Sequence, residues 1–237
     1  MGKVVVLLSG GLDSATTLGY VLSRGNEAVA LSFDYGQKHS LELESGRQIA
    51  EHYGVRREVF RMDFSFASTS SLTSSMEVED RPIEKIGNDI PATYVPARNS
   101  VFLSISSAYA ETLGFDSIAI GVNALDYSGY PDCRPEYINA METALNLGTR
   151  AGVTGRLRIL APLQYLTKGE IIRMGISLGV PYALTRSCYR NGKKACGRCD
   201  SCKLRLRGFM DASSEDPIEY QHLPEFYSSY LENRASP

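Results

Sequence analysis

The residues from Ser9 to Ser14 combine the features of a phosphate-binding loop. Gly10 and Gly11 follow an aliphatic run directly, and they allow the backbone to turn tightly and approach a ligand. The helix expected after them begins with unpaired N–H groups and the positive end of its dipole, which both favour an anion. Ser9 and Ser14 add hydroxyl groups, and Asp13 is suited to orient Mg²⁺ or to cap the helix. We prefer phosphate binding to a plain glycine-rich turn with an Asp cap, because every element lies where phosphate binding needs it.

The loop departs from two widespread phosphate-binding motifs. It lacks the lysine of the Walker loop, and it is not the Gly-x-Gly-x-x-Gly of dinucleotide-binding folds. It resembles instead the pyrophosphate loop of ATP pyrophosphatases, enzymes that adenylate a substrate oxygen and release pyrophosphate. The resemblance implies Mg²⁺ with ATP, and ATP contacts from Leu8, Ser9, Gly10, Gly11, Leu12, Asp13, Ser14 and Asp34.

Four of the five cysteines lie in one short segment and predict a metal site. Cys-x2-Cys spacings let thiolates converge on one tetrahedral ion, and four soft ligands fill its coordination sphere, so that the ion is structural. The ligands are Cys188, Cys196, Cys199 and Cys202. An iron–sulfur cluster is the alternative, but an ATP-dependent reaction needs no redox centre, which favours zinc. The basic residues 203, 205 and 207 alternate with leucines, which indicates a solvated edge rather than a nucleic-acid contact.

A polar loop from Asp126 to Arg134 is placed to receive a substrate. It follows a predicted strand over residues 117–121, and ligands of open α/β sheets bind beyond the carboxyl ends of the strands. Its carboxylates suit the N–H edge of a guanine-like base, and its aromatic rings suit stacking. From composition alone, an ordinary polar loop is an equally good interpretation. The residues predicted to bind substrate are Asp126, Tyr130, Asp132 and Arg134, whereas Cys133 is interpreted as a small buried residue.

Three further side chains are candidates for chemistry. Arg98 is placed at a predicted helix start, where the helix dipole disfavours a cation, so an anionic partner such as phosphate is expected. Lys168 stands at the mouth of another predicted helix and is interpreted in the same way. We expect Arg98 and Lys168 to act with Asp13 as the catalytic residues. His39 suits catalysis and a structural hydrogen bond equally well.

The hydrophobic pattern predicts strands and helices in alternation, and this order predicts an α/β fold with a doubly wound parallel sheet. The run of β-branched residues and leucines at 3–8 is typical of a strand buried on both faces. Strands are expected at 3–8, 27–33, 57–60 and 117–121, and helices at 12–22, 40–53, 99–114, 136–147 and 167–178. Residues 64–92 are rich in Ser and Thr at their centre and predict a long excursion from the sheet, of a length typical of a mobile lid or a disordered segment.

Length and composition limit the classes of protein to which this chain can belong. The chain has 237 residues, 43% hydrophobic and 22% charged, and its net charge of -2 argues against a broad nucleic-acid-binding surface. The aliphatic run at the amino end is too short to span a bilayer and follows no leader, so a cytoplasmic protein is expected. We predict an ATP pyrophosphatase-type α/β domain over 1–185, a zinc-binding segment over 186–210, and a tail over 211–237 that either frays or docks.

The ordered set of motifs resembles one family, the 7-cyano-7-deazaguanine synthases of queuosine biosynthesis, within the adenine nucleotide α-hydrolase-like (HUP) group. The matching pieces run from residue 4 to about residue 209. They are residues 9–14, 33–37 with His39, 93–99, 121–134, 161–163 with Lys168, and the cysteine segment with Tyr189. The resemblance implies a Rossmann-like fold, one structural zinc ion held by the four cysteines, and a homodimer.

The resemblance also implies the activity, an ATP-dependent ligation that turns 7-carboxy-7-deazaguanine and ammonia into the 7-cyano base. The acid and then the amide would be adenylated, and free ammonium is expected because no glutaminase domain fits in this length. The partners are then small molecules, without stable binding to nucleic acid or to a membrane. Two alternatives are another ATP pyrophosphatase that modifies tRNA and a zinc module that binds nucleic acid without catalysis.

Overall fold

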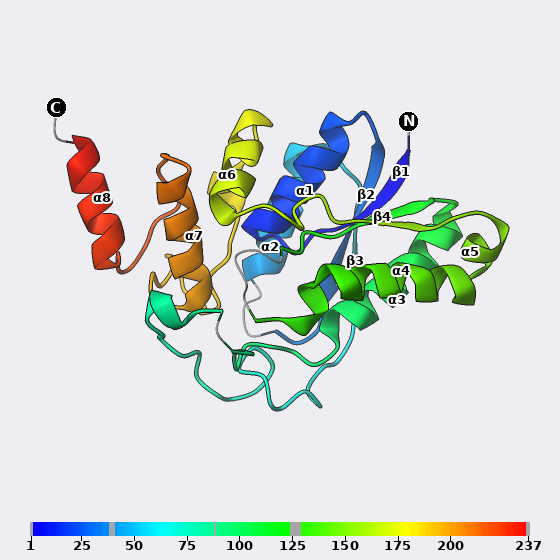
Figure 1. Ribbon diagram of the computed structural model, residues 1–237, viewed down its shortest axis with the longest axis horizontal. Coiled ribbons are helices and arrows are strands. Elements are labelled where there is room, and N and C mark those ends of the chain that lie inside the picture. Colours follow the sequence, from blue (N-terminus) through cyan, green and yellow to red (C-terminus); the bar gives the residue numbers. More distant parts are fainter. Residues whose placement is uncertain (1, 38–40, 88, 124–128, 236–237) are drawn as a thin grey trace.

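A five-stranded parallel sheet forms the centre of the protein, which we describe from a computed structural model (Figure 1). The structure describes residues 2–37, 41–87, 89–123 and 129–235. The strands are β1 (Lys3–Leu7), β2 (Glu27–Asp34), β3 (Arg57–Arg61), β4 (Ser117–Ala119) and β5 (Arg158–Leu160). They lie in the order β3-β2-β1-β4-β5, so that β1 and β4 are neighbours although the chain passes through two other strands between them.

Helices cover both faces of the sheet. They are α1 (Leu12–Ser23), α2 (Leu41–His52), α3 (Arg98–Leu113), α4 (Pro135–Gly148), the short α5 (Arg150–Thr154), α6 (Lys168–Ser177), α7 (Asp200–Asp211) and α8 (Glu225–Ala235). The buried side chains of α1, α2 and α6 pack with Val4 and Val6 of β1, whereas those of α3 and α4 pack with Val5 and Leu7. The central strand is therefore buried on both faces, as its aliphatic run predicts, and the doubly wound α/β fold is confirmed.

Every strand and helix expected from the sequence is present, with bounds that agree within two residues at each end. Four elements of the structure were not expected from the sequence, namely β5, α5, α7 and α8. β5 is only three residues long and α5 only five, too short for a hydrophobic period to be recognised. Among the residues described, no helix has the length and apolar character needed to cross a membrane.

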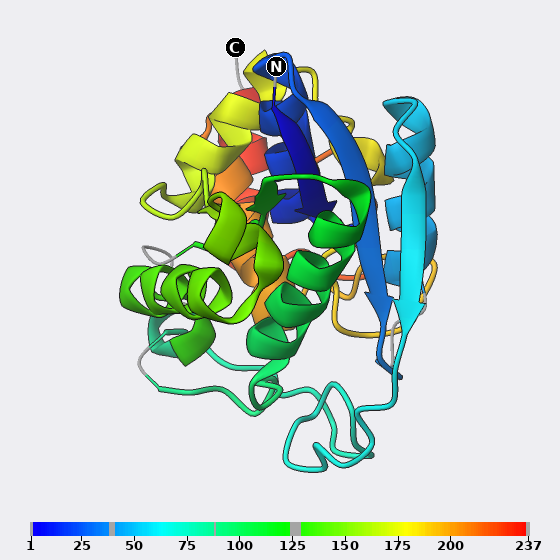
Figure 2. The same cartoon turned by 90° about the vertical axis from the view of Figure 1, so that its right-hand side faces the viewer.

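The excursion over residues 64–92 is anchored along its described part. It extends beyond the carboxyl ends of β2 and β3, and it contains one short 3-10 helix, Ile83–Lys85 (Figure 2). Leu72 is buried in the core that α3 and α4 share with the sheet. Arg81 forms an ion pair with Asp200 at the start of α7, and both side chains are largely buried. These contacts anchor the described part of the excursion to α7 as a wall, whereas its closure over the site stays a prediction.

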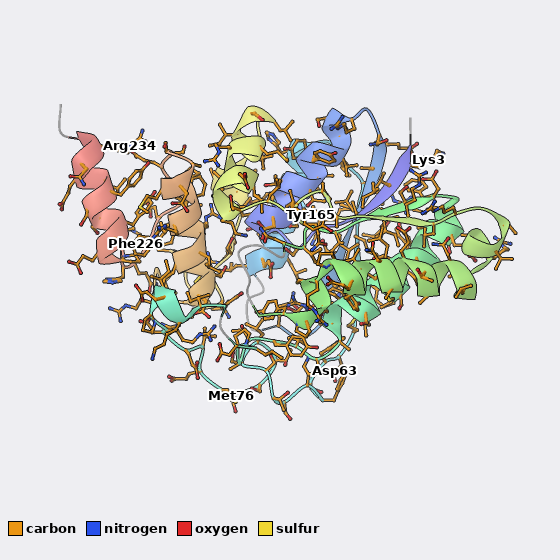
Figure 3. The ribbon with its side chains drawn as sticks, in the orientation of Figure 1. Lys3, Asp63, Met76, Tyr165, Phe226 and Arg234 are labelled. Atoms are coloured by element: carbon orange, nitrogen blue, oxygen red, sulfur yellow. The ribbon has the colours of Figure 1, made fainter. Side chains whose placement is uncertain are left out.

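The described part of the tail docks on α7 through a buried ion pair. Arg205 of α7 and Asp216 are joined by two hydrogen bonds of 2.6 and 2.8 Å, and only 2% and 1% of their side chains are exposed. The N–H of Asp216 donates to the hydroxyl of Tyr227 on α8. Figure 3 shows this helix, marked by Phe226, at one end of the long axis of the molecule. The solvated edge expected after the cysteines is therefore wrong for Arg205.

The pair of Arg205 and Asp216 gives a prediction about stability. Asp216→Asn leaves a buried guanidinium without a counter-charge, so we expect the free energy of unfolding to fall by about 3 to 5 kcal/mol. Urea denaturation followed by circular dichroism measures the change. Asp211→Asn is the matched control, because Asp211 pairs with Arg207 at the surface, where a change of about 0 to 1 kcal/mol is expected. Equal losses in the two variants would contradict a tail held by the buried pair.

Candidate active site

The predicted phosphate loop lies between the carboxyl end of β1 and the first turn of α1. Ser14 accepts a hydrogen bond from the N–H of Gly10 at 3.3 Å, and Ser9 accepts one from the N–H of Gly11 at 3.1 Å. Gly11 is the N-cap of α1, and no side chain forms a capping hydrogen bond there. The alternative of a glycine-rich turn capped by Asp13 is therefore wrong. The side chain of Asp13 contacts Lys168 instead.

Gly10 allows the loop to pack against the backbone of α2. Its φ of +100° lies in the region that favours glycine, and a Cβ atom there would lie 2.2 Å from the carbonyl oxygen of Glu42 and 2.6 Å from the nitrogen of Gly46. On the other side, the N–H of Arg186 donates a 2.9 Å hydrogen bond to the carbonyl oxygen of Gly10. The loop is thus held between α2 and the segment that leads to the cysteines.

An ion pair brings together two of the predicted catalytic residues. The Nζ atom of Lys168 donates hydrogen bonds to both carboxylate oxygens of Asp13, each at 2.8 Å. Lys168 begins α6, whose start is fixed by a capping box between Thr167 and Glu170. The side chains of Asp13 and Lys168 are 31% and 16% exposed, so a ligand can still reach the pair. A cation and a carboxylate at the end of a phosphate loop form a polar centre suited to phosphoryl chemistry.

A cavity of about 260 Å³ opens beside the loop, and a second cavity of about 170 Å³ shares several of its walls. The phosphate loop and the ends of β1, β2 and β4 line one side of the main cavity, and the start of α3 lines another. Ser187 and Tyr189 complete both cavities from the cysteine segment, and Leu72 contributes from the excursion. Asp13 borders both cavities, whereas Lys168 borders the smaller one.

Arg98, the third predicted catalytic residue, lies between two tyrosine rings. Its guanidinium carbon is 6.0 Å from the ring centre of Tyr35 and 5.9 Å from that of Tyr130, and it donates a 3.3 Å hydrogen bond to the hydroxyl of Tyr35. The start of α3 is fixed by Asp132, whose carboxylate accepts a hydrogen bond from the N–H of Asn99 at 3.1 Å. Arg98 thus borders the main cavity as a cation held in place by its neighbours, and the anionic partner expected from the sequence stays a prediction.

The structure brings only part of the predicted substrate-binding set to the cavities. Tyr130 is buried and lines both, with its hydroxyl 2.7 Å from the hydroxyl of Thr93. Asp132 is also buried, and its contact with Asn99 orients it toward α3. Arg134 is exposed and lines neither cavity. Asp126 and His39 lie outside the described residues, so their predicted roles stay untested.

Asp34, predicted to contact ATP, lies near the cavity without lining it. Leu31, Phe33 and Tyr35 of the same segment line the main cavity, and side chains alternate between the faces of a strand. Asp34 consequently points to the other face, where Arg61 lies 3.9 Å away. Its contact with ATP stays a prediction that the lining of the cavity does not support.

Two titratable residues that line the main cavity, Glu42 and Arg186, were not predicted from the sequence, and Glu42 is the carboxyl group of the two. Burial raises the pKa of this carboxyl group to about 7, against the smaller lowering effects of the Ser9 hydroxyl and of Arg98. The available signal was a carboxylate in the first turn of the helix after the second strand. Burial, with Asp132 beside it, raises the pKa of the half-buried Cys133 thiol to about 12, which argues against a nucleophilic thiolate.

The four clustered cysteines meet at one point. All four are buried, and their sulfur atoms lie within 4.8 Å of one another, with Cys196 and Cys202 3.9 Å apart. A tetrahedral ion with bonds of about 2.3 Å to sulfur places its ligands about 3.8 Å apart, so this group can hold a metal ion. The N–H groups of Cys196 and Cys199 donate to the sulfurs of Cys188 and Cys196, which supports thiolate charge.

Comparison with known proteins shows to which family this chain belongs. The family model for the queuosine biosynthesis protein QueC matches residues 3–213. A 7-cyano-7-deazaguanine synthase of Thermoplasma acidophilum is 59% identical over 232 residues, which are 98% of each chain. This chain belongs to the 7-cyano-7-deazaguanine synthase family. The resemblance expected from the motifs is therefore confirmed.

Other members of the family match nearly the whole chain. The 7-cyano-7-deazaguanine synthase of Picrophilus torridus is 56% identical over 234 residues, covering 99% of this chain and 98% of its own. That of Geobacter sulfurreducens is 55% identical over 223 residues, covering 92% of this chain and 93% of its own. The phosphate loop, Arg98, Lys168 and the four cysteines all fall inside the region that the family model matches.

The packing of the phosphate loop gives a second prediction. Gly10→Ala forces a side chain into a strained backbone conformation and against the main chain of α2, so we expect the free energy of unfolding to fall by about 1 to 3 kcal/mol. Gly25→Ala is the control, since Gly25 also has a positive φ of 73° but meets no atom within 4 Å. Chemical denaturation of both variants measures the difference. A smaller loss for Gly10→Ala than for Gly25→Ala would show that α2 does not restrict the loop.

Proposed function

We propose that this protein is an ATP-dependent ligase that converts 7-carboxy-7-deazaguanine and ammonia to 7-cyano-7-deazaguanine in queuosine biosynthesis. The observation that carries the proposal is the ion pair of Asp13 and Lys168 at the phosphate loop, which faces adjoining cavities in a member of the 7-cyano-7-deazaguanine synthase family. The cavities lie at the carboxyl ends of parallel strands, where open α/β sheets bind their ligands.

The chemistry explains why such an enzyme needs ATP. A carboxylate is a poor electrophile because its leaving group would be oxide, so one oxygen must first be adenylated. Ammonia then displaces AMP to give an amide. Loss of the amide oxygen meets the same poor leaving group, so that oxygen is adenylated in turn, and departure of AMP leaves the nitrile. Two ATP molecules are consumed for each nitrile.

Residues of the phosphate loop and its neighbours have matching roles in this proposal. The loop binds the pyrophosphate of ATP, while Lys168 and Arg98 offset the negative charge that develops as pyrophosphate departs. Asp13 offers a partly exposed carboxylate of the kind that Mg²⁺ prefers, so we assign it as the protein ligand of the Mg²⁺ that accompanies ATP. The anchored wall of the excursion helps to keep water from the acyl adenylate.

Substrate recognition involves the aromatic walls of the cavities. Tyr130 lines both, and its ring lies beside the guanidinium of Arg98, so we assign it to stack on the deazaguanine base. We assign Asp132 the role of positioning α3, because its carboxylate bonds to the helix start. Contacts of the base with Asp126 and Arg134 remain predictions from the sequence.

We assign the metal of the cysteine cluster as one structural zinc ion. Four sulfur ligands fill a tetrahedral coordination sphere, and the observed 3.9 Å between two of the sulfurs fits that geometry. The cluster is buried together with Val78 of the excursion, so the metal would hold the wall of the cavity as well as the segment itself.

Three further proposals concern the oligomeric state, the location and the partners of the protein, and they rest on the sequence and the family. They are a homodimer, a cytoplasmic location, and small-molecule substrates without stable binding to nucleic acid. Light scattering of the purified chain gives the oligomeric state, and a filter-binding assay with tRNA at low and high salt gives the affinity for RNA.

One incubation tests the proposed function. Purified protein is mixed with ATP, Mg²⁺, ammonium and 7-carboxy-7-deazaguanine, and the bases and nucleotides are analysed by mass spectrometry. Formation of the nitrile with AMP supports the ligase. AMP without nitrile would point to another ATP pyrophosphatase, for example one that acts on tRNA, and salt-sensitive RNA binding without AMP would point to a binding module.

Removal of the Asp13 carboxylate gives a third prediction. Asp13→Ala leaves Lys168 without its partner and removes the oxygen ligand assigned to Mg²⁺, so AMP formation should fall by about 10²-fold or more. Mass spectrometry of the nucleotides measures the fall, and circular dichroism checks that the variant is folded. AMP formation within threefold of the wild type would contradict the assigned role.

The metal assignment gives a fourth prediction. Cys199→Ser removes one of four ligands, so the variant should lose most of its zinc and melt at a lower temperature. Elemental analysis by mass spectrometry and thermal denaturation measure the two effects. Cys133→Ser, outside the cluster, is the control and should retain the metal. Unchanged zinc content and melting in Cys199→Ser would refute the assignment.

A further inference from the structure

The proposed reaction removes protons from one nitrogen at two stages, and none of the residues assigned above accepts them. Ammonium must lose a proton before its nitrogen can attack the acyl adenylate. Later, the last N–H proton leaves as the bond from carbon to the adenylate oxygen breaks. Both protons depart beside the adenylated carbon, so a base is needed close to the phosphate loop. This inference rests on the proposed function.

Two carboxyl groups are among the described residues that line the main cavity, Asp13 and Glu42. Asp13 is already assigned as the ligand of Mg²⁺, and both of its oxygens accept hydrogen bonds from Lys168. The thiol of Cys133 retains its proton, because burial raises its pKa to about 12. Burial also raises the pKa values of the three lining tyrosines above their ordinary value. Among these described lining groups, Glu42 is a carboxyl group to which the ATP chemistry above assigns no role, and burial brings its pKa to about 7.

The carboxyl group of Glu42 lies against the phosphate loop. Glu42 is in the first turn of α2, at the positive end of the helix dipole. One of its carboxyl oxygens is 3.7 Å from the point where a side chain on Gly11 would begin. The hydroxyl of Ser9 hydrogen bonds to the carboxyl group, and burial brings the pKa of Glu42 to about 7. A carboxyl group with such a pKa accepts and releases protons readily at neutral pH.

We propose that Glu42 is the general base of the nitrogen steps. It binds ammonium beside the phosphate loop, deprotonates it, and later accepts the N–H proton that is lost as the nitrile forms. A carboxylate is a suitable site for ammonium because it offers negative charge and hydrogen-bond acceptors at the same place.

The atoms and electrons balance in both steps. In the first, one ammonium proton goes to Glu42, and the freed lone pair forms the C–N bond. AMP then leaves with the electron pair of the C–O bond, and a second proton goes to water. In the second, the adenylated amide loses one N–H proton to water and the other to Glu42. The N–H electrons complete the triple bond to carbon, and AMP again leaves with the C–O pair.

The test separates adenylation from the nitrogen steps. Wild type, Glu42→Gln and Glu44→Gln are assayed for exchange of labelled pyrophosphate into ATP with 7-carboxy-7-deazaguanine present and ammonium absent. The same proteins are then assayed for amide and nitrile formation with ammonium. Glu44 is the matched control, because it lies in the same helical turn and pairs with Arg47 at the surface.

We expect Glu42→Gln to form amide and nitrile about 10² to 10⁴-fold more slowly than the wild type, while its exchange rate falls by less than about tenfold. Glu44→Gln should match the wild type in both assays. Hydroxylamine, which is uncharged at pH 8, needs no base to become a nucleophile. It should therefore capture the acyl adenylate as a hydroxamate at a similar rate in Glu42→Gln and in the wild type.

Two results would overturn the role of Glu42. Loss of pyrophosphate exchange in Glu42→Gln would make the residue part of the ATP site, and nitrile formation within about tenfold of the wild type would show that the base lies elsewhere. Absence of exchange in the wild type would instead refute the proposed function. Should Glu42→Gln fail to fold, Glu42→Asp replaces it, and the expected result is again slow amide formation with exchange retained.

Discussion

The neighbouring strands β1 and β4 send the chain to opposite faces of the sheet, and the site depends on this reversal. α1 follows β1 on one face, whereas α4 follows β4 on the other. Where successive crossovers diverge in this way, the carboxyl ends of the strands border an open crevice. Asp13 and Lys168 meet there although 155 positions separate them in sequence. The start of α3 brings Arg98 to the same crevice, so the topology determines which side chains can act together.

The crevice is completed by segments that lie outside the parallel sheet. Ser187 and Tyr189 come from the cysteine segment, and Leu72 comes from the excursion. These two segments also hold each other, because Arg81 pairs with Asp200 and Val78 packs in the cysteine cluster. The cysteine cluster and the cavity are thus parts of one structure. A metal ion held by the cysteines would also fix the cavity walls next to them and, through the excursion, the wall formed by Leu72.

The sequence was informative where the determining interactions are local or strictly periodic. Three features each determine a local structure without help from distant residues, and all three were recognised in the sequence. They are the aliphatic run of β1, the glycines of the predicted phosphate loop and the spacing of the cysteines. The burial of Arg205 was not recognised, because alternating basic residues and leucines are usually solvated, and its partner Asp216 comes from a separate segment. Glu42 was missed for the same kind of reason, since only packing against the loop distinguishes it from Glu44.

The orientations of two predicted site residues, Asp34 and Asp132, depend on the alternation of side chains along a strand and on a hydrogen bond at a helix start. Asp34 follows a cavity-lining Phe33, and the pleat turns it to the opposite face. Asp132 stands in a loop rich in possible ligands, yet its carboxylate bonds to the first turn of α3. Both residues were plausible contacts by chemical type. Their orientation depends on neighbours that a motif does not contain.

The serine hydroxyls that bond to the amides of Gly10 and Gly11 also have a consequence for selectivity. A ligand at this loop must compete with neutral acceptors that are already in place. A phosphate oxygen can win that competition, because a charged acceptor forms the stronger hydrogen bond. A neutral carbonyl or hydroxyl group gains little by the exchange. If the loop binds a ligand as predicted, it is therefore expected to favour a charged group over a neutral one.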